Sequence, residues 1–559
     1  MRLPTIDKVR GFALVVILLV GAVSGRGGVE LNEVMPVDNS VLMDEDGDYP
    51  GWVELVNSGS ESIDLGGYGL SDDPRDLFKW VFPSVRVEPG SAVLVFTSGK
   101  NRRTPPGTAV NQTNAAIAPN QIAGLALWLD ATDRGSVVLE DGKVAVWRDR
   151  SGRVPPRFSE TAKSPDQFAG LCLWFDASDR STLRTIEKQV ARWEDKSGAG
   201  NHAVQDNPAA RPVVGVDPAS SLSVVSFDGQ GRYLTFPRLE ELRTVLWVGR
   251  ESPEAPDGYR PLLGDETAYD FHRGDFGRIY WSYAAIRAAT GGALTWLNGE
   301  LVMPTMVALP SEMNLVTTVA STPLRASTLG TDRYLAGRYW WGDIAEVIGF
   351  DRVLSDEERR SVEKYLQEKW RLARPQVHES YDAFQASAGR RPEYRTDALT
   401  GLPHLWFDGE DDGLQFPRLG NIRAVFWVAK ADRTALTHYR PMLGDTVFYD
   451  FHPGEARLLF GVFNASKAVI YGRMRLNGET ARPDATRLPP NWSVLSLVTG
   501  ADCRANTLAW DREMTDRCFA GGFGEVIIYD RELSEAEVDG VEAYLQRKWM
   551  LPMCALHAS

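Results

Sequence analysis

The stretch of residues 171–198, LCLWFDASDRSTLRTIEKQVARWEDKSG, decides the fold, because it contains two strand patterns and two tight turns. Residues 171–175 are apolar throughout, which is typical of a strand buried on both faces. Asp176 and Asp179 then bracket a turn, since short Asp and Ser side chains can bond their own backbone. Residues 190–198 resume the strand pattern and end in a glycine suited to positive φ. The stretch therefore predicts two strands inside a β-sandwich.

The same stretch occurs 46 residues earlier, in residues 122–152. Fifteen of 31 positions match between the segments that begin at residues 122 and 168. The recurring tryptophan, aspartate and glycine positions are Trp128, Asp130, Asp133, Trp147, Asp149 and Gly152, which return as Trp174, Asp176, Asp179, Trp193, Asp195 and Gly198. The opening of one domain has therefore been duplicated.

A longer repeat follows the two opening segments. Its body occurs in residues 203–372 and again in residues 383–551. The motif Tyr-Asp-Phe-His at 269–272 returns 180 residues later, whereas Leu-Asn-Gly at 297–299 returns 179 residues later. A repeat of this length indicates a duplicated domain rather than a solenoid unit.

Each body ends in a pattern that predicts a short amphipathic helix. Ser355 stands three residues before Glu358, and Ser534 three residues before Glu537, which is the spacing of a capping box. The apolar residues that follow fall on one helical face in both bodies: Val362, Tyr365, Leu366 and Trp370, then Val541, Tyr544, Leu545 and Trp549.

The order of the segments is opening, opening, body, body, and the second body has no opening directly before it. A sandwich without its opening strands would expose sheet edges and apolar core. We therefore expect residues 168–372 to form one domain inserted into another, whose opening is 122–152 and whose body is 373–551. The alternative is that 122–152 is a relic packed on the first body. The burial partners of Trp128 and Trp147 distinguish the two arrangements: Phe407, Trp427 and Ile527 for insertion, or Phe227, Trp247 and Ile348 for a relic.

Length and composition favour an all-β multidomain protein. The 559 residues correspond to about three or four domains, and the 51 glycines and 32 prolines suit many short strands. A net charge of −14 leaves no basic surface for a nucleic-acid partner or an anionic membrane.

The N-terminus carries a targeting pattern. Arg2, Lys8 and Arg10 precede the apolar run 11–23, which is too short to span a bilayer comfortably, and residues 22–24 offer a small-x-small cleavage site. We expect a signal peptide at 1–24 and a mature chain without a membrane span, located outside the cell, at its surface or in the periplasm. A retained signal anchor is the alternative.

Residues 25–99 contain short alternating strand patterns separated by Asp, Gly and Ser. The segments 31–33 (LNE), 52–57 (WVELVN), 64–72 (DLGGYGLSD) and 79–83 (KWVFP) resemble the lamin-tail domain, an immunoglobulin-like fold. The resemblance implies a binding or spacer module without chemistry. Residues 100–121 lack periodicity and are interpreted as a linker.

The repeats carry motifs of a second family. LWFDASD, WEDKSGAGNHA, SFDGQGRYL and GDIAEVIGFDRVLSDEE resemble the laminin-G-like, concanavalin A-like jelly rolls of large bacterial surface proteins, over residues 168–551. The resemblance implies two packed antiparallel sheets in each repeat and leaves the ligand open.

The aromatic residues Tyr280, Trp281, Tyr339, Trp340 and Trp341 form a candidate platform for stacking a sugar. Filling of the sandwich core is the alternative role for these side chains.

Candidate metal ligands are Asp44, Asp46 and Asp48, because alternate carboxylates can converge on calcium; a solvated acidic loop is the alternative. His272 and His452 recur after Asp-Phe, where they could bind a metal or hydrogen-bond the neighbouring Asp270 and Asp450.

We predict no catalytic residues, because neither repeat has the alternating acidic strand that a retaining glycosidase on this fold would need. Asp343 and Glu346 are three apart, and the cluster 410–412 becomes Gln-Gly-Arg in the first repeat. The expected function is non-catalytic binding or adhesion to an extracellular polysaccharide or a surface protein. A secreted carbohydrate-active enzyme, or its accessory subunit, is the alternative.

Four cysteines are too few to serve as a scaffold. Cys503 and Cys518 flank the turn residues Asp511 and Arg512, so that a disulfide across a hairpin is predicted. Cys172 and Cys554 have no evident partner.

Overall fold

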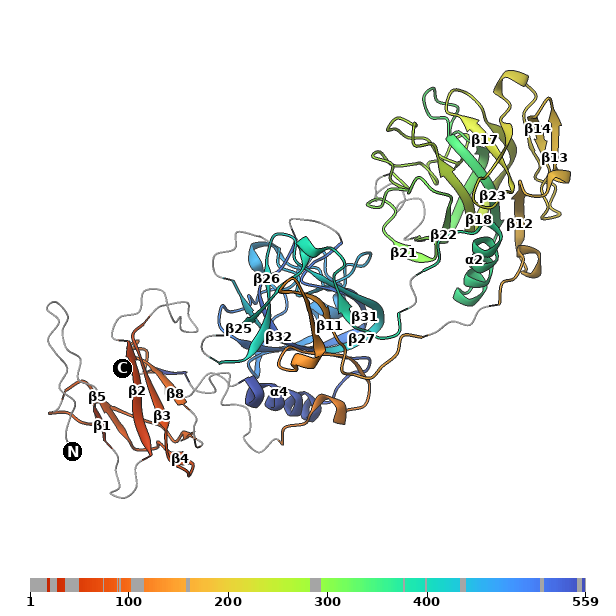
Figure 1. The fold of residues 1–559 in the computed structure, drawn as a ribbon. Coiled ribbons are helices and arrows are strands. Elements are labelled where there is room, and N and C mark those ends of the chain that lie inside the picture. Colours follow the sequence, from red (N-terminus) through yellow and green to blue (C-terminus); the bar gives the residue numbers. More distant parts are fainter. Residues whose placement is uncertain are drawn as a thin grey trace. The chain divides into compact units, whose positions relative to one another are not determined.

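The computed structural model describes residues 18–20, 28–35, 50–73, 75–87, 89, 92–101, 115–156, 161–281, 293–375, 378–397, 400–432, 439–512, 517–549 and 555–557. These residues form an almost entirely β-stranded protein, as the sequence predicts (Figure 1). The chain divides into two compact units, Met1–Pro155 with Glu379–Ser559, and Pro156–His378.

The N-terminal sandwich is built from short antiparallel strands: β1 (Leu18–Val20), β2 (Val29–Met35), β3 (Trp52–Asn57), β4 (Ile63–Asp64), β5 (Gly69–Ser71), β6 (Trp80–Val81), β7 (Arg86–Val87) and β8 (Ala92–Phe96). The strand order β2-β3-β8 forms its main sheet, and β33 (Ala555–His557) extends that sheet in parallel with β8. Val53, Leu55, Trp80 and Phe82 are buried in its core, as the alternating pattern predicts. β1 lies within the expected signal peptide and pairs with β5.

The inner repeat, defined as residues 161–375, is a twelve-stranded antiparallel sheet. Its elements are β12 (Leu171–Asp176), β13 (Leu183–Ile186), β14 (Gln189–Trp193), β15 (Ala203–Val204), β16 (Val213–Val216), β17 (Ser223–Asp228), β18 (Leu234–Glu251), β19 (Leu263–Gly264), β20 (Leu294–Leu297), β21 (Glu300–Val302), β22 (Asn314–Leu329), β23 (Trp341–Phe350) and α2 (Asp356–Trp370). Three register shifts between β18 and β22 interrupt their pairing, and such irregularities let a sheet bend around its core.

The outer repeat, defined as residues 115–156 and 378–549, is a second twelve-stranded sheet. Its elements are β9 (Leu125–Asp130), β10 (Val137–Glu140), β11 (Lys143–Trp147), β24 (Ala383–Phe384), β25 (Glu393–Thr396), β26 (Pro403–Asp408), β27 (Leu414–Ala431), β28 (Leu443–Gly444), β29 (Arg473–Leu476), β30 (Glu479–Ala481), β31 (Ser493–Leu508), β32 (Ala520–Tyr529), α3 (Lys467–Ile470) and α4 (Glu535–Trp549).

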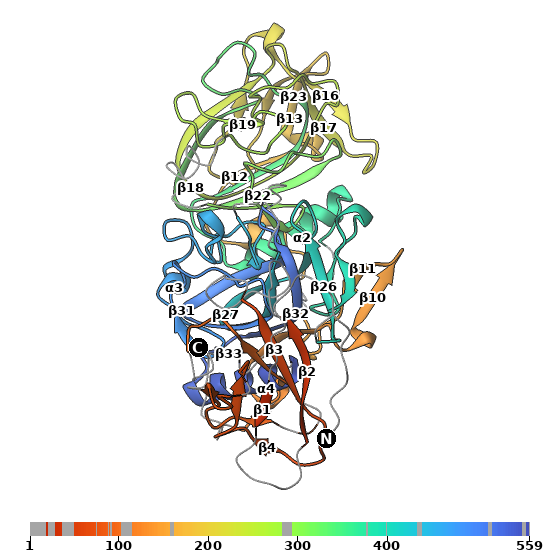
Figure 2. The same cartoon turned by 90° about the vertical axis from the view of Figure 1, so that its left-hand side faces the viewer.

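The two repeats pair their opening strands in the same register. In the inner repeat Trp174 of β12 lies opposite Ile348 of β23, and in the outer repeat Trp128 of β9 lies opposite Ile527 of β32. Trp147 shares a buried cluster with Phe407 and Trp427. The opening strands 122–152 therefore complete the outer repeat, and in the sequence the inner repeat is inserted between the two segments of the outer one. Figure 2 shows β10 and β11 beside the strands of the second body.

The opening strand β12 is buried on both faces, as its apolar run predicts. Leu173 and Phe175 join the cluster inside the bent sheet, whereas Trp174 joins the cluster beneath α2. The Ser355 hydroxyl accepts from the Glu358 backbone N–H, and the Glu358 carboxylate accepts from the Ser355 N–H, so that the predicted capping box starts α2.

The end of the predicted linker belongs to the outer repeat. Ile122 is buried in its core and Ile117 packs against it, and the Ile117 N–H donates to the Gly540 carbonyl of α4. None of the helices in the described part of the chain has both the length and the apolar character needed to cross a bilayer.

Candidate functional site

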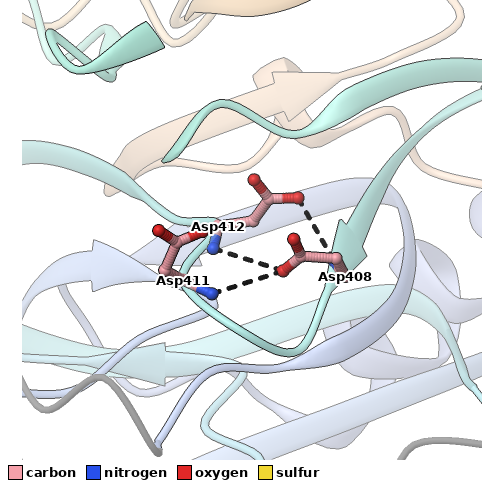
Figure 3. A group of neighbouring side chains, drawn as sticks. All are labelled: Asp408, Asp411 and Asp412. Atoms are coloured by element: carbon pink, nitrogen blue, oxygen red, sulfur yellow. Dashed lines mark hydrogen bonds between the residues drawn. The ribbon is translucent and has the colours of Figure 1, made fainter. Parts of the chain in front are cut away.

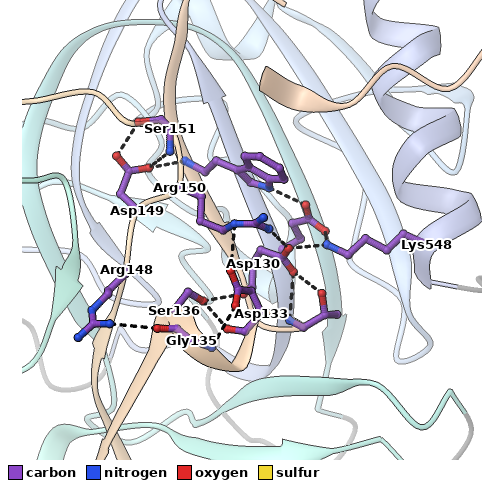
Figure 4. Close-up of polar contacts among 12 residues, drawn as sticks. Asp130, Asp133, Gly135, Ser136, Arg148, Asp149, Arg150, Ser151 and Lys548 are labelled. Carbon is purple, nitrogen blue, oxygen red and sulfur yellow. Dashed lines mark hydrogen bonds and ion pairs between the residues drawn. The ribbon is translucent and has the colours of Figure 1, made fainter. Parts of the chain in front are cut away.

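The recurring tryptophan and aspartate residues of the opening strands meet a half-buried lysine (Figure 4). In the outer repeat the Lys548 Nζ lies 2.7 Å from Asp130 Oδ2 and 2.8 Å from Glu525 Oε2. The Trp128 Nε1–H donates to Glu525 Oε1 at 2.7 Å, and the Trp549 Nε1–H donates to Glu525 Oε2 at 2.9 Å. One network thus joins β9, β32 and α4.

The inner repeat contains the same network. Lys369 Nζ lies 2.8 Å from Asp176 Oδ1 and 2.7 Å from Glu346 Oε2, and the indoles of Trp174 and Trp370 donate to Glu346. Burial raises the pKa of Glu346, and the neighbouring Asp176 adds to that effect. Donors occupy both carboxylate oxygens of Glu346. The tryptophan and aspartate positions that recur in the sequence therefore hold the strands and the helix of each repeat together.

A pocket of about 210 Å³ opens in the outer repeat. Buried Met442, Leu459 and Phe519 supply apolar side chains to its lining. Arginine side chains line it as well: Arg440, which is only 6 % exposed, with Arg457 and Arg487, which are exposed. At about 30 Å³ per water molecule the volume corresponds to roughly seven waters, so the pocket accommodates one small group rather than a long chain.

Equivalent backbone hydrogen bonds align this region with the inner repeat. The Phe519 N–H donates to Ala509 O as the Trp340 N–H donates to Gly330 O. Leu458 and Arg487 form an isolated antiparallel β-bridge, as Arg278 and Ala308 do in the inner repeat. Phe519 therefore corresponds to Trp340, and Arg487 to Ala308.

The inner repeat fills the corresponding position with side chains. Trp340 is fully buried, and Arg273 lies over its ring at 5.4 Å and forms an ion pair with Glu251. The outer repeat has Ala431 and Pro453 in place of Glu251 and Arg273, and these smaller side chains, together with Phe519, leave the pocket open.

Arg457 occupies a backbone conformation that normally favours glycine. Its φ is 67°, and the inner repeat has Gly277 with φ 69° at this position. A side chain in the left-handed region costs of order 1 kcal/mol or more. The outer repeat therefore places a charged side chain at a turn position where the inner repeat has glycine.

The guanidinium groups of the pocket lie close enough to influence one another. Burial lowers the pKa of Arg440, and the positive charge of Arg457 lowers it further, whereas Asp432 opposes the shift. Arg440 Nη1 donates to the Asp432 carbonyl at 2.7 Å, and Arg487 Nε donates to the Ala456 carbonyl at 2.9 Å. The arrangement favours an anionic group over a cationic one.

The predicted aromatic platform is not brought together on the surface. Tyr280 and Trp340 are 3 % and 0 % exposed and belong to the interior cluster of the inner repeat, so the prediction that they stack a sugar is wrong. Trp281, Tyr339 and Trp341 are half-buried. Tyr339 stacks on Tyr233 with ring centroids 6.2 Å apart.

The two histidines have structural partners different from those expected. His272 Nδ1 lies 2.7 Å from Asp332 Oδ2, whereas Asp270 accepts from Arg325. His452 instead donates from Nδ1 to the carbonyl of Pro453. The prediction that each histidine hydrogen-bonds its neighbouring Asp is therefore wrong.

An acidic cluster lies after β26, where Asp408, Asp411 and Asp412 place carboxylate oxygens within 4.8 Å of one another (Figure 3). Burial raises the pKa of Asp412 to about 7, and Asp408 adds to the effect. Asp408 Oδ1 accepts the backbone N–H groups of Glu410, Asp411 and Asp412, as in an ordinary turn, so we assign no metal to the cluster. The predicted ligands Asp44, Asp46 and Asp48 lie outside the described residues.

The predicted disulfide is absent, and Cys172, Cys503 and Cys518 are free thiols. Trp510 lies opposite Cys518 across the hairpin, and Cys503 pairs with Ile422 of another strand. Cys503 is seven residues from Trp510, which is about 23 Å along an extended strand. Burial raises the pKa of both thiols to about 12. Cys554 lies outside the described residues.

Reasoning from the sequence missed the arginine-lined pocket. The available signal was the set of positions at which the two aligned repeats differ in charge, namely Glu251 against Ala431, Gly277 against Arg457 and Ala308 against Arg487. The shared aspartate and glutamate positions instead form the two lysine networks.

Comparison with known families identifies one part of the chain. The model of the lamin tail domain matches residues 22–157, which confirms the assignment of the N-terminal sandwich. The match continues into β9–β11, although these strands pair within the outer repeat. No curated protein and no solved structure gives a significant match.

Proposed function

We propose that this chain is a non-catalytic extracellular binding protein whose laminin-G-like outer repeat holds its ligand. The observation that carries the proposal is the pocket beside Phe519 in the outer repeat, at a position where the inner repeat has the larger and fully buried Trp340. The lamin tail domain would serve as a spacer or a second binding module. An extracellular polysaccharide or a surface protein is the expected partner.

The composition of the pocket supports binding rather than hydrolysis. A glycosidase of the usual kind needs two carboxyl groups across the scissile bond, whereas Asp432 is the one carboxylate in the described lining. Glu346 and Glu525, the fully buried acids beside the opening strands, have both oxygens bound by lysine and tryptophan donors.

A substitution that closes the pocket tests this proposal. Phe519→Trp restores the side chain of the inner repeat, so we expect at least a tenfold loss of binding to whichever glycans the native protein retains on an array. The matched control is Trp340→Phe, which alters the inner repeat and should leave binding unchanged.

Incubation of the retained glycan with native protein should release no reducing sugar. Release that one Asp or Glu substitution abolishes would establish the enzymatic alternative, and binding unaffected by Phe519→Trp would place the ligand elsewhere.

A further inference from the structure

We propose that the pocket of the outer repeat takes the carboxylate or sulfate group of an acidic polysaccharide, an inference that rests on the proposed binding function. Arg440, Arg457 and Arg487 would contact the oxyanion. Phe519, Met442 and Leu459 would contact the apolar face of the sugar ring that carries it. The following observations favour this class of ligand over a neutral glycan.

The first observation is the direction of change between the repeats. The inner repeat has two arginines and one glutamate at the corresponding positions, and its Arg273–Glu251 ion pair is internal. The outer repeat replaces that pair with Ala431 and Pro453 and gains Arg457 and Arg487. Asp432, in place of Ser252, is the one opposing change in the described lining. In the inner repeat an internal ion pair neutralises one arginine of this site. In the outer repeat the described lining contains three guanidinium groups and one carboxylate.

The second observation is the state of Arg487. Its Nε donates to the Ala456 carbonyl, which fixes the guanidinium next to Arg457. Within the described chain Arg487 forms no ion pair, and its two Nη groups make no hydrogen bond. A guanidinium held by one nitrogen presents its remaining N–H groups as a fork that matches carboxylate and sulfate oxygens.

The third observation is the backbone at Ala456 and Arg457, which have φ values of 54° and 67°. The equivalent residues Phe276 and Gly277 have φ values of 53° and 69°, so the turn is the same in both repeats. The turn does not require an arginine, because Gly277 makes it with less strain. Arg457 therefore contributes charge to the pocket at a cost in stability.

The size of the pocket favours a saccharide over a protein partner. A space of about 210 Å³ is below the 300–1,000 Å³ typical of drug-sized ligands. It suits one substituted sugar ring with its charged group. The carboxylate of a single Asp or Glu side chain would fill less of this space and would leave the apolar lining uncovered.

The test measures binding of the full-length protein to polygalacturonate, to its fully methyl-esterified form, to dextran sulfate and to dextran. We expect binding to a charged polymer and at least tenfold weaker binding to its neutral counterpart. Binding to polygalacturonate reports recognition of a carboxylate, and binding to dextran sulfate reports recognition of a sulfate. Poly-glutamate provides the protein-like polyanion and should bind more weakly than either.

Arg457→Gly and Arg487→Ala, which introduce the residues of the inner repeat, should each weaken polyanion binding about tenfold or more, since each removes charged hydrogen bonds to the oxyanion. Arg457→Gly should keep or raise the melting temperature, which separates lost binding from lost folding. Arg482→Ala is the matched control, because Arg482 is exposed and pairs with Asp484.

Equal binding of charged and neutral polymers would overturn this inference and leave the proposed function intact. Tighter binding of poly-glutamate, or variants that bind polyanions as well as the native protein, would also overturn it. Failure to bind any glycan or surface protein would instead contradict the proposed function itself.

Discussion

At the scale of single residues, the two repeats differ in the charge of one residue that follows a strand of the same backbone conformation. Arg232 of the inner repeat pairs with Asp228 at 2.8 Å. The outer repeat has Asp412 and Asp408 at the same positions. Asp412 is 2 % exposed, and its Oδ1 has no hydrogen-bond partner. An attractive pair has therefore become a repulsive one.

Asp412 should make the outer repeat less stable as the pH rises. Burial and Asp408 raise its folded-state pKa from 3.8 to about 7, so the unfolded chain releases a proton that the folded chain retains. Stability falls from about pH 4 to pH 7, and the full loss is present above pH 7. In the presence of a chelator, Asp412→Asn should stabilise the repeat by about 1–3 kcal/mol at pH 8 and by little at pH 4.

Thermal unfolding at the two pH values measures this difference. Glu410→Gln is the control, because Glu410 is exposed in the same turn. An equal gain from Asp412→Asn at pH 4 and pH 8 would contradict the raised pKa.

Sequence patterns predict the residues that stabilise helices, strands and turns, but they do not predict the arginine-lined pocket. The capping boxes, the buried tryptophans and the turn aspartates could be predicted, because each depends on neighbours close in sequence or on an obvious repeat. The pocket depends on Phe519, Arg440 and Arg457, which lie on separate loops. Their proximity follows from long-range strand pairing that no local pattern encodes.

At the scale of elements, the lysine network fastens an opening strand and a terminal helix to the same central strand. Lys548 reaches from α4 to Asp130 of β9 and Glu525 of β32. Removal of one member of a buried ionic network leaves the other charges without compensation. The network therefore couples the stability of three elements that are distant in sequence.

Lys548→Met should destabilise the outer repeat by about 3–5 kcal/mol, and Lys369→Met should do the same to the inner repeat. Differential scanning calorimetry should show each variant lowering a different transition. If both variants lowered the same transition, the two repeats would not unfold independently.

Element patterns also explain the failure of the disulfide prediction. Cys503 and Cys518 do flank a turn, but the bridge between Trp510 and Cys518 fixes which residues face each other. Distance along the sequence does not specify register, and only register determines which side chains meet.

At the scale of the whole molecule, the insertion begins and ends at adjacent points of the outer repeat. Trp147 pairs with Ala383, and the Asp149 N–H donates to Asp382 Oδ1 at 2.9 Å. Chain ends that lie this close allow a domain to be inserted or removed without distorting its host. The nested order could be predicted from the sequence because the second body lacks its own opening.

Excision should therefore leave the outer repeat folded. A chain in which a short Gly-Ser linker replaces residues 156–378 should keep the outer transition in calorimetry and retain binding to the native protein's ligand. Residues 379–549 alone should fail to fold, because β9 and β11 would be missing from the core. A cooperative transition from that fragment would contradict the role of β9 and β11.

The nested connectivity also has a consequence for biosynthesis. β11 ends at Trp147, whereas β32, the partner of β9, ends at Tyr529. At about 5–20 residues per second a ribosome needs roughly 20–75 s to cover that interval. During this time the inserted domain can finish folding while the earlier strands wait with unsatisfied edges. The newly made chain should therefore depend on a holding chaperone for those strands until the last third of the protein has been translated.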